Sequence, residues 1–555
     1  MDHNSSKMKF LSSRIFKLLA IATILIAGLA TTVVTTETGN YFEIAKNIEI
    51  FANLYKEVNT YYVDEIDPAK LMRTGVDAML ESLDPYTNYI SESQIEGFRY
   101  ITEGRYNGIG ADIRIIADLP TIVSPYEGAP AQQAGLKAGD QILEIDGRDT
   151  KGKTNDEVSA ILKGYPGTEV KMTIQRPGES KKLKITLVRD EVSIPNVPFS
   201  DMITPEVGYI ALTTFTRDAG SNVGKALEKL KVEQPNLKGI ILDLRGNGGG
   251  LLAEAVNVAN VFIPKNELVV STKGKVKDWD RSFKTLNAPL DEKVPLIVLI
   301  DKGSASASEI VSGVIQDLDR GVIIGQSSFG KGLVQNTRDI GYNAKVKMTT
   351  AKYYIPSGRC IQSIEYKQGA PAEISDDKRT PFKTRNGRPV LDGGGVRPDV
   401  LLDHDASGIL QTLDEKNFVF NYVTQWMLKN PNAQPMADDF HFDQWDDFVQ
   451  FLEKQQFDYD TEAEQLLKDL KEKSKNDGYI SEADIKALEA KIIEAKKRDL
   501  NKHKALVTNM IEKEILSRFL YEKGRIKVGL RNDLEIKEAV KLFDDKAKYD
   551  ALLKG

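Results

Sequence analysis

This sequence has few cysteines and histidines and no excess of positive charge. Each of these features excludes some classes of function. The chain of 555 residues has one cysteine, so no disulfide can form within it. The cysteine count is therefore compatible with a reducing or an oxidising compartment. Its net charge is −6, which gives no indication of a nucleic-acid partner. No histidine pair has the spacing of metal ligands, so neither a metal nor a cofactor is expected. The histidines are His3, His404, His441 and His503.

One stretch, Lys475 to Ser481, imitates the centre of a calcium-binding EF-hand loop, with Gly478 in the sixth place. Lys473 and Lys475 stand at the first and third ligand positions, where carboxylate or amide oxygens are required. The sequence therefore predicts no calcium site here.

Positive residues precede a mostly apolar run at the N-terminus. Lys7, Lys9 and Arg14 lead into Ile15 to Val34, which is broken by Lys17 and by threonines. This pattern is typical of an export signal, or of a membrane anchor whose positive side stays in the cytoplasm. The run is long for a signal peptide and just adequate to span a bilayer, which favours an anchor. We expect residues 1–36 to direct export and the remainder to be periplasmic, either soluble or anchored to the inner (cytoplasmic) membrane.

The length suggests three or four domains, and the first of them is predicted to be helical over residues 41–100. Ile44, Ile48 and Phe51 recur at helical spacing, and a second helix is expected from Ala69 to Leu83. Between Val207 and Thr350 strands alternate with helices, which predicts an α/β core.

A serine-rich turn follows the apolar strand Val294 to Ile300. Ser304, Ser306 and Ser308 alternate with alanines just before an apolar series at helical spacing, so one serine lies at a helix N-terminus. Free N–H groups and the helix dipole favour developing negative charge there, as acyl-transfer chemistry requires. The alternative is structural, because Ser306 with Glu309 forms the S-x-x-E pattern of a capping box.

Lysine is the remaining candidate for a general base, because no histidine lies near the serine turn in sequence. A Ser-His-Asp triad would have to borrow a histidine from the C-terminal region, whereas serine-lysine pairs are a recognised solution. Lys331 lies between Gly330 and Gly332, where a buried amine with a lowered pKa could accept the serine proton. Gln335 could hold that amine in line. The alternative is an ordinary surface lysine in a glycine turn.

Three glycines in Asp243 to Leu252 lie between a buried strand and a helix. No Gly-Lys-Ser/Thr follows and the G-x-G-x-x-G spacing fails, so this loop is neither a Walker loop nor a dinucleotide fingerprint. Beside a serine nucleophile, the N–H of Gly249 or Gly250 could join that of Ala307 as an oxyanion donor. The sequence leaves open which glycine donates.

Residues 104–190 read as short strands, glycine turns and one helix. The N–H groups of Gly108, Ile109, Gly110 and Ala111 could bind a carboxylate while a strand edge pairs an extended peptide. With the string APAQQAGLKAGDQILEIDG, this region resembles a PDZ domain, which implies that it grips the C-terminal tail of a substrate. The alternative is a small β-rich domain without a ligand.

The turn GSASASE followed by FGKGLVQ resembles the carboxyl-terminal processing peptidases, also called tail-specific proteases. The resemblance covers about residues 41–402. It implies that Ser306 is the nucleophile, that Lys331 is the general base and that Gln335 is the third member of the catalytic set, which holds the base in place. Asp317 matches an acidic position of that family and is interpreted as structural. The family's core is similar to the crotonase and Clp protease fold, with an inserted PDZ domain and the region 41–100 packing on the core.

The expected organisation is therefore an α/β peptidase core over 191–403 and a solvated, helical C-terminal domain over 405–555. Lys367 to Arg388 is polar and is expected to be a flexible surface insertion. We predict an exported serine endopeptidase that acts on proteins with exposed C-terminal tails, with a homo-oligomer or an adaptor left open. A catalytically silent PDZ scaffold at the membrane and a crotonase-like acyl-transfer enzyme are the alternatives.

Overall fold

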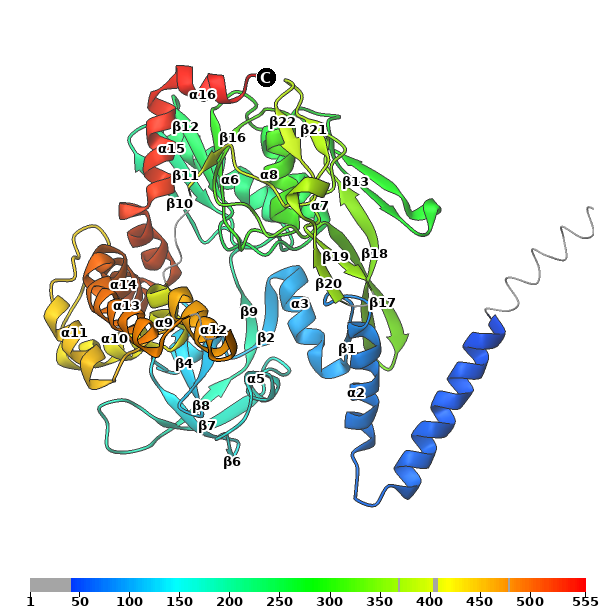
Figure 1. Ribbon diagram of the computed structural model, residues 1–555, viewed down its shortest axis with the longest axis vertical. Coiled ribbons are helices and arrows are strands. Elements are labelled where there is room, and N and C mark those ends of the chain that lie inside the picture. The colour runs from blue at the N-terminus through cyan, green and yellow to red at the C-terminus, as the bar shows by residue number, and fades with distance from the viewer. Residues whose placement is uncertain (1–40, 368–369, 403–407, 478–479) are drawn as a thin grey trace, which may run out of the picture. The chain divides into compact units, whose positions relative to one another are not determined.

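The computed structural model describes residues 41–367, 370–402, 408–477 and 480–555, so the predicted export segment lies outside the described residues (Figure 1). The chain divides into a unit that ends at Ser82 and a larger unit from Leu83 to Gly555. Within the described ranges, no helix combines the length and apolar character needed to cross a membrane.

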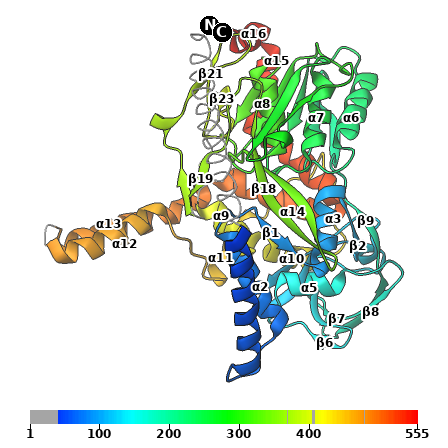
Figure 2. The same ribbon diagram turned by 90° about the vertical axis from the view of Figure 1, so that its right-hand side faces the viewer.

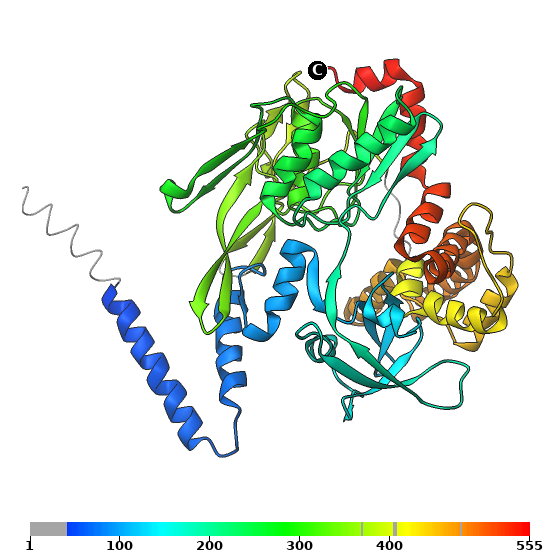
Figure 3. The same cartoon turned by 180° about the vertical axis from the view of Figure 1, so that it is seen from behind.

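From residue 41 onward the first unit holds two helices, residues 41–61 and α2 (Pro68–Glu81), seen from behind in Figure 3. Asp67 caps α2 by accepting hydrogen bonds from the N–H groups of Ala69 at 2.8 Å and Lys70 at 3.2 Å. Proline at the first helical position needs no N–H partner, so Pro68 suits this start. The helix ends at Glu81, two residues before the predicted end.

The larger unit is built around a six-stranded sheet whose order is β10-β11-β12-β15-β16-β23. Only the β10–β11 pair is antiparallel, and the other pairs are parallel. The predicted α/β core is therefore confirmed. The strands are β10 (Phe199–Thr204), β11 (Val207–Ala211), β12 (Gly239–Asp243), β15 (Leu296–Ile300), β16 (Val322–Gly325) and β23 (Val400–Leu401).

Helices cover both faces of this sheet, which explains why β11, β12, β15 and β16 are buried at every position without alternation. Ile240 and Leu242 point into one hydrophobic cluster and Ile241 into another. The first cluster contains α6 (Ala219–Glu233), α7 (Leu252–Phe262) and α8 (Ala307–Asp317). The second contains α15 (Leu534–Asp544) and α16 (Lys546–Leu552), drawn in red beside the sheet (Figure 1).

A second, antiparallel sheet has the order β1-β18-β13-β14, with β17 also paired to β18. Its first strand lies in the region that was predicted to be helical throughout, because residues 88–90 pair with β18 instead of continuing a helix. The strands are β1 (Asn88–Ile90), β13 (Leu268–Gly274), β14 (Arg281–Lys284), β17 (Leu333–Gly341) and β18 (Ala344–Tyr354); short 3-10 turns are η1 (Glu92–Gln94) and η2 (Lys277–Trp279).

The region predicted to resemble a PDZ domain follows α3 (Ile95–Glu103) and is closed by the pair β2 (Arg105–Gly108) and β9 (Asp190–Ser193). Its sheet has the order β3-β4-β5-β7-β8, with β6 paired to β5. These elements are β3 (Ala111–Ile116), β4 (Leu119–Pro125), α4 (Pro130–Gln133), β5 (Gln141–Ile145), β6 (Arg148–Asp149), α5 (Asn155–Leu162), β7 (Glu169–Gln175) and β8 (Leu183–Val188).

The described part of the predicted insertion, residues 367–388, holds β20 (Ala370–Glu373), η3 (Asp376–Lys378) and β21 (Pro381–Lys383). β20 pairs with β19 (Ile364–Lys367), and β21 pairs with β22 (Pro389–Leu391). The C-terminal domain is helical, as predicted. Figure 2 shows α12 and α13 side by side. The remaining helices are α9 (Gly408–Glu415), α10 (Phe418–Lys429), α11 (Trp445–Lys454), α12 (Glu462–Asp477), α13 (Glu482–Lys502), α14 (Lys504–Gly529) and η4 (Leu530–Asn532).

Candidate active site

Ser306 is the N-terminal cap residue of α8, in the turn that follows β15. Its backbone has φ 56° and ψ −109°, a conformation that residues with a side chain rarely adopt. Strain of this kind persists where the surrounding structure holds it and is frequent at active sites. The helix N-terminus also favours negative charge at this position.

The other two serines of the turn are engaged structurally. The Ser304 hydroxyl donates to the carbonyl of Leu244 at 2.8 Å, and the Ser308 hydroxyl donates to the carbonyl of Asn247 at 2.8 Å. Both serines are buried, whereas Ser306 is half-buried. Of the three, Ser306 is therefore the one that a substrate can reach.

The carboxylate of Glu309 joins the turn of Ser306 to the turn of Lys331. One oxygen accepts the N–H groups of Ser306 at 2.8 Å and Lys331 at 2.9 Å. The other accepts the Ser328 hydroxyl at 2.6 Å and the N–H of Gly330 at 2.7 Å. Burial raises the pKa of Glu309, and these four donors act against that rise. The capping pattern is therefore present, but its carboxylate also fixes the lysine turn.

The side chain of Lys331 is half-buried and lies over an aromatic ring. Its Nζ is 4.5 Å from the ring centroid of Tyr86. Burial lowers the pKa of Lys331, and the charge of Lys347 acts in the same direction. Glu309 and Asp84 oppose that shift. Burial and the charge of Lys347 thus make it easier for the amine to give up its proton than for an exposed lysine.

Two further contacts fix the backbone on either side of the site. The hydroxyl of Tyr353 lies against the carbonyl oxygens of Ser306, at 3.1 Å, and of Lys331. Gly330 has φ 85°, and a Cβ there would lie 2.3 Å from the Ser363 hydroxyl oxygen. The glycine before Lys331 therefore allows a close approach of two chain segments, as the sequence suggested.

Gln335 lies on β17 opposite Thr349 of β18. Its amide N–H donates to the Thr349 hydroxyl at 3.2 Å. Among the described residues, no hydrogen bond joins Gln335 to Lys331, nor Lys331 Nζ to the Ser306 hydroxyl. The structure thus brings the elements that carry the three predicted residues together without placing their side chains in hydrogen-bond contact.

The glycine loop distinguishes between the two candidate oxyanion donors. The N–H of Gly249 donates to the side-chain oxygen of Asn247 at 2.9 Å, so it is already engaged. Phe215 pairs with Gly250 in a parallel bridge whose bonds use the carbonyl of Gly249 and the N–H of Leu251. Those bonds leave out the N–H of Gly250. The N–H of Gly249 is thus engaged within the loop, whereas the N–H of Gly250 takes no part in these bonds.

Gly249 has a different role, which is to let the loop touch the nucleophile turn. A Cβ at Gly249 would lie 2.7 Å from the carbonyl oxygen of Ala305, 2.8 Å from Ser306 Cβ and 2.9 Å from the nitrogen of Ala307. Asn247 strengthens this contact because its carbonyl accepts the N–H of Ala305 at 3.0 Å.

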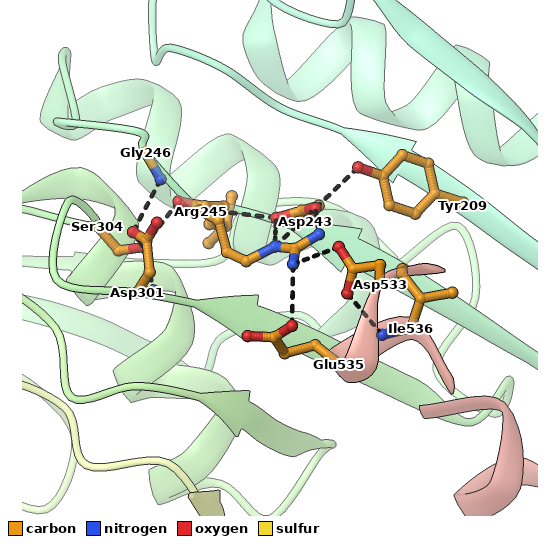
Figure 4. A network of polar contacts seen from close by, with 10 residues as sticks. Tyr209, Asp243, Arg245, Gly246, Asp301, Ser304, Asp533, Glu535 and Ile536 are labelled. Atoms are coloured by element: carbon orange, nitrogen blue, oxygen red, sulfur yellow. Dashed lines mark hydrogen bonds and ion pairs between the residues drawn. The ribbon is translucent and has the colours of Figure 1, made fainter. Parts of the chain in front are cut away.

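The start of the same loop is tied to the C-terminal helices by Arg245 (Figure 4). Its guanidinium pairs with Asp243 at 2.6 Å, with Asp533 at 2.7 Å and with Glu535 at 3.4 Å. The hydroxyl of Tyr209 donates to Asp243 at 2.8 Å. Although burial opposes ionisation, Arg245 keeps the pKa of Asp533 below its usual value.

On the other side of the loop, Asp301 accepts the N–H groups of Gly246 at 2.8 Å and Gly303 at 2.9 Å, which links the glycine loop to the serine turn (Figure 4). Asp317 lies at the far end of α8, paired with the buried Arg359 at 2.9 Å and accepting the N–H of Ser357 at 2.9 Å. These contacts are structural, in line with the interpretation of Asp317 from sequence.

The predicted carboxylate-binding residues form the connection between β2 and β3 of the PDZ domain. Gly110 has φ 75°, and a Cβ there would lie 2.3 Å from the Cβ of Ala129. The N–H groups of Gly110 and Ala111 act to lower the pKa of Tyr106, although burial raises it more.

A groove of about 290 Å³ lies beside this connection, between β3 and α5. Its apolar lining includes Ile109, Val158 and Leu162, and its polar lining includes Asp112 and Lys163. Gly108 and Ile109 complete the predicted set, with Ile109 buried.

Sequence reasoning missed the residues that connect the site, namely Glu309 as a bridge, Asn247, Tyr353 and Tyr86. Glu309 had a signal, since the capping pattern was noted. The other three come from segments remote in sequence. In the described part of the chain, no group of three or more His, Cys, Asp or Glu side chains is placed to hold a metal ion.

Comparisons with family models match three parts of the chain. Residues 206–369 match peptidase family S41, residues 121–176 match the PDZ domain, and residues 409–543 match the C-terminal helical domain of probable PDZ-proteases. The catalytic candidates Ser306, Lys331 and Gln335 all lie within the S41 match.

Similar proteins carry matching names. A carboxy-terminal-processing protease of Bartonella bacilliformis is 39% identical over 329 residues, which are 59% of this chain and 75% of the relative. A probable CtpA-like serine protease of Staphylococcus aureus is 35% identical over 368 residues, 65% of this chain and 73% of the relative. The solved photosystem II D1 C-terminal processing protease is 27% identical, covers 64% of this chain and 92% of its own, and has a TM-score of 0.35.

The sequence relatives and the family models agree with each other, and they favour a peptidase over a silent scaffold or an acyl-transfer enzyme. The chain belongs to the carboxy-terminal-processing proteases of peptidase family S41, and it is a serine-type peptidase that carries a PDZ domain and a C-terminal helical domain.

Proposed function

We propose that this chain is an exported endopeptidase that binds C-terminal tails through its PDZ domain and cleaves with Ser306 as nucleophile and Lys331 as general base. The observation that carries the proposal is the carboxylate of Glu309, which binds the backbone N–H groups of both residues. A strained helix-cap serine and a half-buried lysine of lowered pKa, fixed by one carboxylate, suit acyl transfer.

In this mechanism the neutral amine of Lys331 takes the proton from the Ser306 hydroxyl as the oxygen attacks the peptide carbonyl. The N–H groups of Ala307 and Gly250 stabilise the oxyanion. Lysine then protonates the leaving amine, and water hydrolyses the acyl-enzyme. Lys331 has to swing from Tyr86 toward Ser306 first, and catalytic hydrogen bonds are often long before substrate binds. The free oxygen of the Gln335 amide can then orient the amine.

Substrate selection is assigned to the PDZ groove. A terminal carboxylate would bind the N–H groups of Gly108 to Ala111, and an apolar terminal side chain would fit against Ile109, Val158 and Leu162. Export is proposed from the positive and apolar N-terminal sequence, with the enzyme acting in the periplasm, soluble or anchored to the inner membrane.

The test is proteolysis of an unfolded protein with an apolar C-terminal tail, compared with the same protein whose terminal carboxylate is amidated. Wild type should cleave the free tail faster, and Ser306→Ala and Lys331→Ala should bind the tail without cleaving. Lys302→Ala, an exposed lysine just before the serine turn, is the matched control and should cleave normally. Cleavage by Ser306→Ala or Lys331→Ala at the wild-type rate would refute the proposal.

A further inference from the structure

A turn that precedes the PDZ domain in sequence reaches the candidate base. The ring of Tyr86 faces Lys331, with Nζ 4.5 Å from the ring centroid. Tyr86 lies before β1, within the region 41–100 that the sequence predicted to be helical. Cation–π contact at this distance favours a charged ammonium over the ring face.

The turn that carries Tyr86 is rigidly built. Asp84 is buried, and one of its oxygens accepts the N–H groups of Tyr86 and Thr87, both at 2.9 Å. The hydroxyl of Thr87 donates to the other oxygen at 3.1 Å and accepts the N–H of Thr349 at 3.1 Å. Thr349 is also the partner of the Gln335 amide. The turn is thus attached to β18 next to the predicted orienting residue.

The far side of the Tyr86 ring is also fixed. The ring of Tyr366 meets it edge-on, with centroids 6.0 Å apart, and the two hydroxyl oxygens are 3.4 Å apart. The aromatic face that Lys331 contacts is therefore held from the hydroxyl end while the backbone is held by Asp84.

We propose that the ring of Tyr86 is the resting seat of the Lys331 side chain, a positioning residue that holds the lysine in its charged form and away from Ser306 until substrate engages. The inference rests on the proposed serine-lysine mechanism and adds a residue to it. Tyr86 acts through Lys331 and touches no reacting atom.

The proposal has a directional consequence for pH dependence. The charged groups that face Lys331 are Glu309 of α8, Asp84 of the turn and Lys347 of β18, and Tyr353 of β18 contacts its carbonyl. Replacing the ring leaves all of these in place. Loss of the cation–π contact removes a stabilisation of the ammonium, so the neutral amine becomes available at lower pH.

The experiment measures the rate at which a small sulfonyl fluoride modifies Ser306 in the full chain as a function of pH, normalised to each variant's high-pH plateau. This reagent reacts without a substrate tail bound to the PDZ domain. Its rate therefore reports how much of Lys331 is in the neutral form that accepts the serine proton. Tyr86→Leu keeps bulk but removes the ring, and we expect its normalised rate below the inflection to rise roughly tenfold over wild type. Tyr86→Phe keeps the ring and should follow the wild-type curve.

A Tyr86→Leu curve that matches wild type would overturn the inference, as would a Tyr86→Phe curve that shifts as far as that of Tyr86→Leu. If Tyr86→Leu does not fold, judged by thermal unfolding, Tyr86→Trp provides the test, because its stronger cation–π contact should move the inflection to higher pH. Lys331→Ala separates the two hypotheses. Wild-type reactivity in that variant refutes the serine-lysine mechanism itself, whereas an unreactive Lys331→Ala with unshifted Tyr86 variants refutes only the role of Tyr86.

Discussion

At the scale of single residues, Glu309 has partners that all donate hydrogen bonds. Two are the backbone N–H groups of Ser306 and Lys331, and two more come from Ser328 and Gly330. Three of these partners are backbone N–H groups, which can only donate, and the two oxygens of a carboxylate can accept from all of them. The four bonds offset the burial that raises the pKa of Glu309. The nucleophile turn and the base turn are therefore held in register by one carboxyl group.

Glu309→Gln should damage activity more than folding. An amide must turn its NH₂ group toward N–H donors, so at least one bond is lost and the two turns shift. We expect kcat/KM to fall about 10²-fold, because displacement of about 1 Å has that effect. Unfolding free energy should fall by roughly 2 kcal/mol. Ser312→Ala on the same helix removes a buried hydroxyl that bonds only within α8, and it should keep wild-type kcat/KM. Equal activity of Glu309→Gln and wild type would contradict this role.

Lys347 offers a test of how the environment sets the pKa of Lys331. Burial lowers that pKa first, and the nearby charge of Lys347 lowers it further. Lys347→Gln removes a like charge, so the pKa of Lys331 should rise. Because the neutral amine is the active form, the acid limb of the pH–rate profile should move to higher pH. The measurement is kcat/KM across the pH range, and a limb that moves to lower pH would show that Lys347 acts in another way.

At the scale of elements, the site depends on the contact of the glycine loop after β12 with the N-terminus of α8. Gly249 lies against the backbone of Ala305 and Ala307, and Asn247 bonds to that turn. Oxyanion donors are effective only when they are already aimed at the developing charge. The close approach of these two elements provides that arrangement.

Comparing Gly249→Ala with Gly246→Ala should show whether activity is lost through a steric clash with the serine turn or through backbone strain alone. Gly249 has φ 98° and no room for a Cβ, whereas Gly246 of the same loop has φ 67° and open space around it. Each alanine should add backbone strain of about 1 kcal/mol or more. Only the Cβ of Gly249→Ala would clash with Ser306. We expect at least a 10²-fold loss of kcat for Gly249→Ala and a much smaller loss for Gly246→Ala. Similar losses in both variants would mean that strain alone explains the effect.

The sequence predicted the elements of the core from local patterns, and it indicated Ser306 and Lys331 through a helix-cap turn, a glycine-flanked lysine and the resemblance of both motifs to processing peptidases. It did not predict β1, since three residues that pair with a distant strand have no periodic signal of their own. The sequence did not indicate roles for Asn247, Tyr353 and Tyr86 either, because tertiary packing determines which groups they contact. Gly249 and Gly250 could be told apart only once the bond to Asn247 was known.

At the scale of the larger unit, the last two helices of the chain belong to the peptidase core. The sequence predicted one solvated helical domain over 405–555, but α15 and α16 bury Ile536, Leu542 and Phe543 against the central sheet. Their apolar residues are spaced so that one helix face meets β11, β12 and β15. The Arg245 cluster adds a polar link from α15 to the glycine loop. Loss of these helices would thus expose one face of the sheet.

Two leucines of α15 test this arrangement. Leu542 is 0% exposed and Leu534 is 53% exposed. Leu542→Ala should lower the unfolding free energy by roughly 2–5 kcal/mol, because a cavity opens against the sheet. Leu534→Ala should change it by less than about 0.5 kcal/mol. Urea unfolding followed by residual peptidase activity measures the effect on the core, and equal midpoints for the two variants would contradict the packing.

The most direct test of the central claim is to label the enzyme with a fluorophosphonate and map the adduct by mass spectrometry. The account predicts one adduct on Ser306 in wild type, none in Ser306→Ala, and labelling slowed by several orders of magnitude in Lys331→Ala, while Lys302→Ala is labelled as fast as wild type. An adduct on another residue, or wild-type labelling of folded Lys331→Ala, would contradict it.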